Sequence, residues 1–235
     1  MKRNAKTLGV VMITVLALSF AIAPAAHANN ITAGAYPAVL TGKDVNTEHG
    51  KLTRITIGNG ARFVECTTMT WSATLTSAQT EVDFTPTYAG CFSNGLTTVP
   101  ATITTNGCVY RIHPTSTTMG QTTIICPEGK QIEIHIYENT TRHEENKPLC
   151  TYDIAAQGPI TGITFSVANP GLANEGFRMN FTDLAKFNVT STMGSLVVCG
   201  VNATSGHAAT TGSARGEYVV TGKSGGVDTK VMLEH

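Results

Sequence analysis

Apolar and polar residues alternate along several separate stretches of this chain. The alternation runs through residues 99–104, 132–136, 163–168 and 177–182. A longer run, FVECTTMTWSATL, places five apolar side chains on one face: Phe63, Met69, Trp71, Ala73 and Leu75. Successive side chains of a strand point to opposite faces, so a period of two indicates strands with one buried face. Many outward positions are threonine, whose branched β-carbon suits a pleated strand.

Turn-forming residues separate these stretches. Examples are Asn59-Gly60, Asn94-Gly95 and Asn106-Gly107, and such pairs favour tight turns. No segment has a convincing helical period. The pattern therefore predicts an all-β chain folded as an antiparallel β-sandwich, in which two sheets stack on their apolar faces. A β-barrel is the alternative architecture, because a closed sheet produces the same alternation.

The chain contains six cysteines, which are Cys66, Cys91, Cys108, Cys126, Cys150 and Cys199. An even number of cysteines in an exported chain predicts a set of disulfides. None of them has the C-x-x-C spacing of redox motifs or zinc knuckles. We therefore expect three disulfides that staple the β fold.

The strand pattern suggests how the cysteines pair. If residues 113–121 connect two antiparallel strands, position 112 faces position 122 and Cys108 faces Cys126. Facing positions on adjacent strands lie within disulfide reach. A scheme that joins nearest neighbours then predicts Cys66–Cys91, Cys108–Cys126 and Cys150–Cys199, although six cysteines allow many other connectivities.

The first 28 residues have the features of a secretory signal peptide. Basic residues open the segment, and an apolar run follows at residues 8–23. Ala26, His27 and Ala28 then form a small-x-small cleavage signature. A membrane anchor is the alternative, but the run is short for a spanning helix and Pro24 follows it directly. We expect cleavage after Ala28.

Cleavage leaves residues 29–235, which we expect to form one all-β domain; a boundary near residue 114 would divide it into halves. This part has 13 basic and 16 acidic residues, a net charge of −3. Such a balance does not support nucleic-acid binding. No further stretch is long and apolar enough for a transmembrane segment. We therefore expect a secreted extracellular protein, free or held at the cell surface.

Residues 130–150 hold the candidate metal ligands. Glu133 and His135 lie two positions apart on one strand face, and His143 follows in a polar loop. A catalytic zinc takes three protein ligands, so these residue types would suffice. They lack the i, i+4 spacing of helical zinc motifs, and an outward strand face with a charged loop explains them equally. We interpret the segment as a surface hairpin and expect no metal, no cofactor and no catalytic residue.

The order of four segments resembles a group of exported proteins. The segments are FVEC, FTPTYAGC, ATITTNGCVYRI and TTIICPEGKQIEIHI, within residues 63–136. This order of cysteines and glycines resembles small secreted proteins of high-GC Gram-positive bacteria that have no assigned activity. The resemblance implies an exported, cysteine-stapled β protein and adds no functional residue.

These features favour a secreted, non-enzymatic module. Its function would be to bind a protein or glycan partner through loops on a rigid scaffold. The predicted loops are residues 113–121, 138–149 and 203–216. A structural cell-surface or fibre subunit, joined through edge strands at residues 36–42 and 217–231, is the second hypothesis. A metal-dependent hydrolase that uses Glu133, His135 and His143 is the third.

Overall fold

The structure of the chain is a computed structural model. The structure describes residues 29–45, 52–58, 62–94, 99–137, 148–193, 199 and 208–234. The predicted signal peptide, the candidate ligand His143 and most of the predicted loop at residues 138–149 lie outside these ranges.

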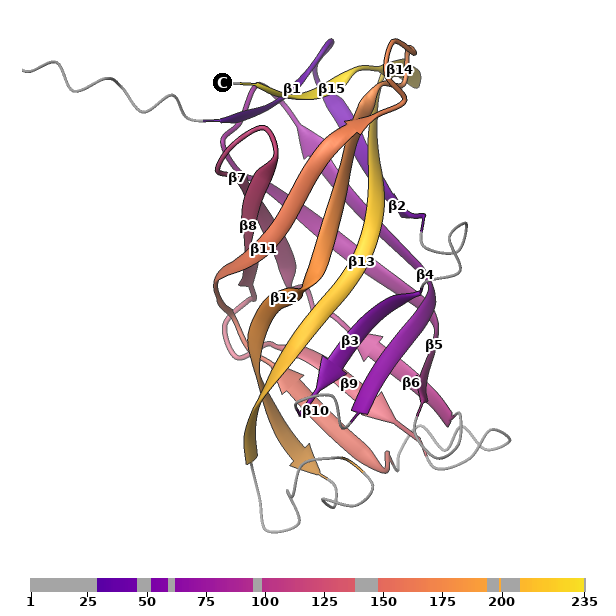
Figure 1. Cartoon of the computed structure of the whole chain (residues 1–235), viewed down its shortest axis with the longest axis vertical. Helices are drawn as coiled ribbons and strands as arrows, with labels where there is room; N and C mark the ends of the chain where they lie inside the picture. The colour runs from indigo at the N-terminus through magenta and orange to yellow at the C-terminus, as the bar shows by residue number, and fades with distance from the viewer. Residues whose placement is uncertain are drawn as a thin grey trace, which may run out of the picture.

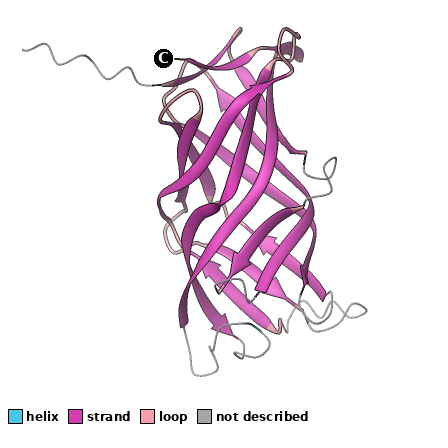
Figure 2. Cartoon of the chain, in the orientation of Figure 1, coloured by secondary structure: helices cyan, strands magenta, loops and turns pink. Residues whose placement is uncertain are grey.

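The described part of the chain forms fifteen β-strands (Figures 1 and 2). They are β1 (Asn30–Ala33), β2 (Ala38–Asp44), β3 (Thr53–Ile57), β4 (Arg62–Leu75), β5 (Val82–Asn94), β6 (Val99–Thr104), β7 (Val109–Pro114), β8 (Met119–Ile125), β9 (Ile132–Ile136), β10 (Cys150–Ile154), β11 (Gln157–Ala168), β12 (Gly176–Met193), β13 (Ala208–Ser224), β14 (Val227–Thr229) and β15 (Val231–Glu234). The described residues include no helix that is long and apolar enough to cross a membrane.

The predicted strands are confirmed. Residues 99–104 form β6, residues 132–136 form β9, and the other two alternating stretches lie within β11 and β12. In β9 the three isoleucines are buried while Glu133 and His135 are only partly covered. The alternation along the sequence therefore reports the core-facing side of β9, whereas it fails at the end of β11, where Val167 is 63% exposed and Ala168 is buried.

Strand β4 departs from the prediction at one end. Met69, Trp71 and Leu75 are buried and Ala73 packs against the core, as expected. Phe63 does not share their face, because its neighbour Val64 is the fully buried residue there. Phe63 is only partly buried, and its ring centroid lies 4.0 Å from the Arg54 guanidinium. Thr67 and Thr68 are both exposed, and Cys66 before them is buried. The inward face therefore shifts by one residue at these threonines.

One antiparallel sheet surrounds the core. Its 13 strands follow the order β10-β9-β6-β5-β7-β8-β11-β12-β13-β2-β4-β3, with β14 paired to β13. The further pairings β10–β12, β5–β4 and β13–β3 join strands that lie far apart in this order, so the sheet curves round and meets itself (Figure 1). The all-β antiparallel class is confirmed, and the apolar faces that pack together are opposite walls of this one sheet.

The two ends of the described chain pair with each other. Strands β1 and β15 form a separate two-stranded sheet in which Ile31 faces Leu233. Ile31 and Val231 are fully buried there, at one end of the molecule (Figure 1). Two of the expected edge strands are not edges, because β2 lies between β13 and β4, and β13 between β12 and β2. Of the predicted pairing edges at residues 36–42 and 217–231, the prediction is therefore wrong for β2 and β13, whereas β14 pairs only with β13 in the described part of the chain.

The predicted disulfide scheme is confirmed. Cys66–Cys91 joins β4 to β5, with Cα atoms 3.9 Å apart. Cys108–Cys126 closes the β7–β8 hairpin with Cα atoms 4.1 Å apart, and Ile112 faces Thr122 as the predicted register requires. Cys150–Cys199 ties β10 to a residue beyond β12, and no described cysteine is free. Three disulfides fit a protein of an oxidising, extracellular compartment.

Candidate binding sites

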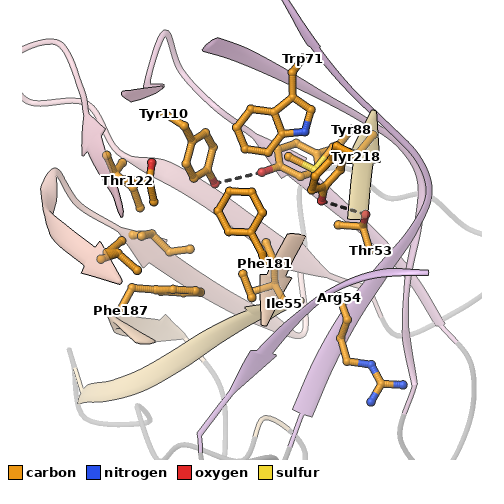
Figure 3. Close-up of a pocket in the computed structure, with 15 residues that line it drawn as sticks. Thr53, Arg54, Ile55, Trp71, Tyr88, Tyr110, Thr122, Phe181, Phe187 and Tyr218 are labelled. Atoms are coloured by element: carbon orange, nitrogen blue, oxygen red, sulfur yellow. Dashed lines mark hydrogen bonds between the residues drawn. The ribbon is translucent and has the colours of Figure 1, made fainter. Parts of the chain in front are cut away.

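An aromatic cavity lies inside the sheet (Figure 3). It has a volume of about 40 Å³. The side chains around it come from nine strands and are Thr53, Arg54, Ile55, Met69, Trp71, Tyr88, Tyr110, Thr122, Ile124, Ile154, Ile160, Phe181, Phe187, Ala214 and Tyr218. A cavity of this size has room for water or for a very small ligand.

Trp71 holds the aromatic side chains of this cavity together. Its ring stacks on Phe181, with centroids 5.6 Å apart and planes 19° apart. The ring of Tyr110 lies 5.0 Å away, and the ring of Tyr218 lies 5.1 Å away and edge-on. These residues belong to β4, β12, β7 and β13, so strands that are distant in the sheet order meet at one indole. Offset and edge-on arrangements of this kind stabilise aromatic clusters.

A short chain of hydrogen bonds crosses the cavity wall. The Thr53 hydroxyl donates to the Asp44 carboxylate. Since that uses the only hydroxyl proton of Thr53, the Tyr218 hydroxyl, 2.9 Å away, donates to the Thr53 oxygen. The Met69 sulfur, 3.0 Å from the Tyr218 oxygen, is then a close contact beside this bond. These two hydrogen bonds fix the Tyr218 phenol in a buried position.

Two further phenols bond to each other. The Tyr88 and Tyr110 hydroxyls are 2.9 Å apart and point toward each other at the cavity (Figure 3). Burial raises the pKa of Tyr88 well above its ordinary value, and the neighbouring Tyr110 raises it further. Burial is also the main cause that raises the pKa of Tyr110 and of Tyr218. At neutral pH these groups are therefore uncharged hydrogen-bonding groups.

Thr122 is a polar side chain that the cavity leaves unsatisfied. It is only 2% exposed, and its Oγ1 has no hydrogen-bond partner among the described residues. Its cross-strand neighbours Ile112 and Ile160 are buried, so the side chain shares their inward face. A buried hydroxyl without a partner costs free energy, which a bound water or ligand group would recover.

A polar groove of about 660 Å³ lies on the outer surface. It is lined by Asn30, Thr74, Ala78, Gln79, Thr80, Glu81, Asp83 and Arg111. Arg111 is on β7, the first strand of the β7–β8 hairpin, and the predicted binding loop at residues 113–121 begins two residues later. The groove therefore combines amide, hydroxyl, carboxylate and guanidinium groups beside one predicted loop.

Arg111 is held between two carboxylates in this groove. It faces Asp83 across the β5–β7 ladder, and its Nε and Nη2 donate to Asp83 oxygens at 2.7 and 2.9 Å. Glu81 lies 3.6 Å from both Arg111 Nη1 and His113 Nδ1. The hydrogen bond with Asp83 raises the pKa of Arg111, so this guanidinium stays charged.

The candidate metal ligands do not form a metal site in the described residues. His135 Nε2 lies 3.8 Å from Glu133 Oε2 on the outer face of β9. No group of three or more histidine, cysteine, aspartate or glutamate side chains that could hold a metal occurs in the described ranges. His143, the third candidate, lies outside them. The pair is placed as the surface-hairpin interpretation expects.

The three predicted loops have different outcomes. In the first, residues 115–118 form the turn of the β7–β8 hairpin, and the flanking residues belong to the strands. Residues 138–147 of the second lie outside the described ranges, as do residues 203–207 of the third. Residues 208–216 belong to β13 and pair with β12 and β3, so the prediction of a loop there is wrong.

Comparison with known proteins gives no relative from which a function can be transferred. No protein-family profile, no curated protein and no solved structure matches the chain. Neither the aromatic cavity nor the polar groove was indicated by a sequence motif, because both depend on which strands lie next to one another.

Proposed function

We propose that this protein is a secreted, non-enzymatic binding protein that holds a glycan in the polar groove beside the β7–β8 hairpin. Export is supported by the three disulfides and by the predicted signal peptide. The observation that carries the proposal is the Arg111 guanidinium held between Asp83 and Glu81 in an open groove of about 660 Å³.

The chemistry of the groove suits a hydroxyl-rich ligand. A sugar hydroxyl is both a donor and an acceptor, so it pairs with carboxylates, amides and a guanidinium alike. Asp83 and Glu81 keep more than two-fifths of their side chains exposed, and their remaining lone pairs are available to a ligand. The bidentate bond to Asp83 fixes Arg111, which reduces the entropy lost when a ligand binds. The cross-stapled sheet supplies the rigid support.

The experiment is a glycan array probed with the oxidised protein, followed by calorimetry on the strongest glycan. The variant Asp83→Ala removes a charged acceptor and frees Arg111, so we expect at least a roughly tenfold loss of affinity. The control is Asp228→Ala on β14, since Asp228 is similarly exposed and pairs with Lys223 at 3.8 Å. That variant should bind like the parent.

Two results would refute the proposal. Glycan binding that is equal in the Asp83→Ala variant and the parent would place the glycan elsewhere. Binding that is confined to a protein partner, with no glycan on the array retained, would show that the groove does not recognise sugars.

A further inference from the structure

The wall of the sheet has a gap between β11 and β12. The ladder between these strands runs from the Ala168–Gly176 pair to the Ile163–Phe181 pair and stops there. The next ladder on the same side of β12 is with β10, and it begins at the Asp153–Thr190 pair. The first part of β11 instead follows β8, with register shifts on both sides of Ile160. In the part of β11 and β12 that the structure describes, residues 157–162 and 182–189 therefore flank an opening in the backbone hydrogen bonding.

Two side chains span this opening. The Thr182 hydroxyl donates to the Gly162 carbonyl at 3.1 Å, next to the last ladder pair, and Gln157 forms a bridge to Asn188 at the other end. Gln157 Nε2 donates to the Asn188 carbonyl at 2.9 Å, and the Asn188 N–H donates to Gln157 Oε1 at 2.6 Å. An amide side chain thus takes the place of a strand backbone. These two bonds lie at an exposed position, where water competes for both groups. The bridge can open at a smaller free-energy cost than a continuous ladder.

A depression of about 250 Å³ lies over the opening. It is lined by Gln157, Gly158, Pro159, Ile160, Phe187, Asn188 and Thr211. Ile160 and Phe187 line the aromatic cavity as well, so these two side chains separate the solvent from the interior. The Phe187 ring lies over Gly212, where a β-carbon would come within 2.5 Å of it. The ring occupies space that only glycine leaves open.

We propose that the aromatic cavity binds a small planar aromatic molecule with one hydroxyl group, which enters past Phe187 through the β11–β12 gap. The lining is apolar and aromatic apart from a few hydroxyls and Arg54, whose guanidinium points away from the aromatic rings of the cavity and pairs with Glu65 (Figure 3), and this matches a phenol-like ligand. The unsatisfied Thr122 hydroxyl supplies the partner for the ligand hydroxyl. An apolar cavity of about 150 Å³ can hold benzene, so the 40 Å³ present is too small until Phe187 moves outward.

Phenol is the probe for the test, and Trp71 is the reporter. Trp71 is the only tryptophan of the chain and lines the cavity, so its emission reports occupancy directly. We expect phenol to change this emission in a saturable way. Thr122→Val keeps the shape of the side chain and removes its hydroxyl, so phenol affinity should fall about two- to tenfold. Toluene, which lacks the hydroxyl, should bind both proteins equally.

The rate at which phenol associates with the protein tests the proposed entrance. Phe187→Ala removes the ring that closes the gap, and Gln157→Ala removes the bridge from the surface without altering the core. Each variant should associate with phenol several-fold faster than the parent in stopped-flow measurements of Trp71 emission. Asp83→Ala should leave phenol binding unchanged, which separates this site from the proposed glycan groove.

Three results would overturn the proposal. One is the absence of a saturable phenol signal in both the parent and the Phe187→Ala variant. Another is equal phenol affinity in the Thr122→Val variant and the parent. The third is an unchanged association rate in the Gln157→Ala variant, which retains the complete core and therefore isolates the gap.

Discussion

Single residues explain why the interior is both aromatic and neutral. Trp71 contacts side chains from four other strands, and the rings of three largely buried tyrosines lie around the same cavity. Each tyrosine hydroxyl has a partner inside the protein, which offsets the cost of removing it from water. A phenolate would lose more hydration, and hydrogen bonds from neighbouring groups offset only part of that loss for Tyr110 and Tyr218. The raised pKa values of Tyr88, Tyr110 and Tyr218 all result mainly from this burial.

These tyrosines predict a loss of stability at alkaline pH. In the unfolded chain a tyrosine loses its proton near pH 10. The folded protein keeps these protons to higher pH, so it binds more protons than the unfolded chain above about pH 10. The contribution of these tyrosines to the free energy of unfolding should therefore be constant well below pH 10 and fall as the pH rises above it. Urea unfolding at a series of pH values, followed by Trp71 emission, measures this.

The variant Tyr218→Phe tests the cause. It removes one of the raised groups, so the decline above pH 10 should become shallower by about 1.4 kcal/mol per pH unit. Its baseline stability at neutral pH also reports the lost bond to Thr53. If the decline has the same slope in the variant and the parent, Tyr218 is not a source of the alkaline sensitivity.

At this scale the sequence predicted the core role of Trp71 but not its neighbours. Alternation shows which way a side chain points and does not show what it meets across the core. The one-residue shift at Thr67 and Thr68 was also invisible, because Phe63 continues the odd-numbered apolar positions of β4, although the structure buries Val64 and Cys66 there. To predict the cavity, one would need both the contacts across the core and the position of this shift in β4.

Whole strands were predicted best where bulky side chains alternate. The first half of strand β13, residues 208–216, was missed because it is rich in glycine, alanine and threonine. The structure gives a packing reason for those small residues. A β-carbon at Gly212 would collide with the Phe187 ring, and one at Gly216 would collide with the Tyr218 hydroxyl. The absence of bulky residues in this strand makes room for rings from β12 and from β13 itself.

The disulfides were predicted from hairpin register, and they give a prediction at the scale of elements. In the chain-entropy account, a bridge stabilises more when it closes a longer loop. Cys150–Cys199 spans 49 residues and Cys108–Cys126 spans 18. Replacing either pair with alanines should cost about 2–4 kcal/mol, and the longer loop should cost about 0.9 kcal/mol more. Urea unfolding of the two double variants measures this difference.

Equal costs, or a larger cost for Cys108–Cys126, would contradict the entropic ranking. The native hairpin contacts of β7 and β8 would then have to depend on their bridge. Circular dichroism of both variants in the absence of urea is the control, because the comparison requires that each retains the same strand content.

At the scale of the whole molecule, the pattern of a strand does not identify its neighbours. Strand β5 pairs with β4, β6 and β7, and β12 pairs with β10, β11 and β13. Long strands such as these pair with different neighbours along their length. Alternation within a strand does not reveal those pairings. The pairing of β1 with β15 was equally hidden, since both are short and lie at opposite ends of the chain. The fold class was therefore predictable, and the strand order was not.

The meeting of the chain ends leads to a prediction about cooperativity. Ile31 on β1 is completely buried and its strand pairs with β15, so Ile31→Ala leaves a cavity in the core and should cost about 2–5 kcal/mol. Val39→Ala on β2 is the control, because Val39 is 54% exposed and its replacement should cost less than about 0.5 kcal/mol.

Both variants are measured by urea unfolding with two probes, Trp71 emission and far-ultraviolet circular dichroism. Because Ile31, Val231 and Trp71 belong to one cluster of buried side chains, both probes should shift together in the Ile31→Ala variant. A circular-dichroism transition that moves while the Trp71 transition stays in place would show that the paired ends open alone and do not stabilise the rest of the sheet.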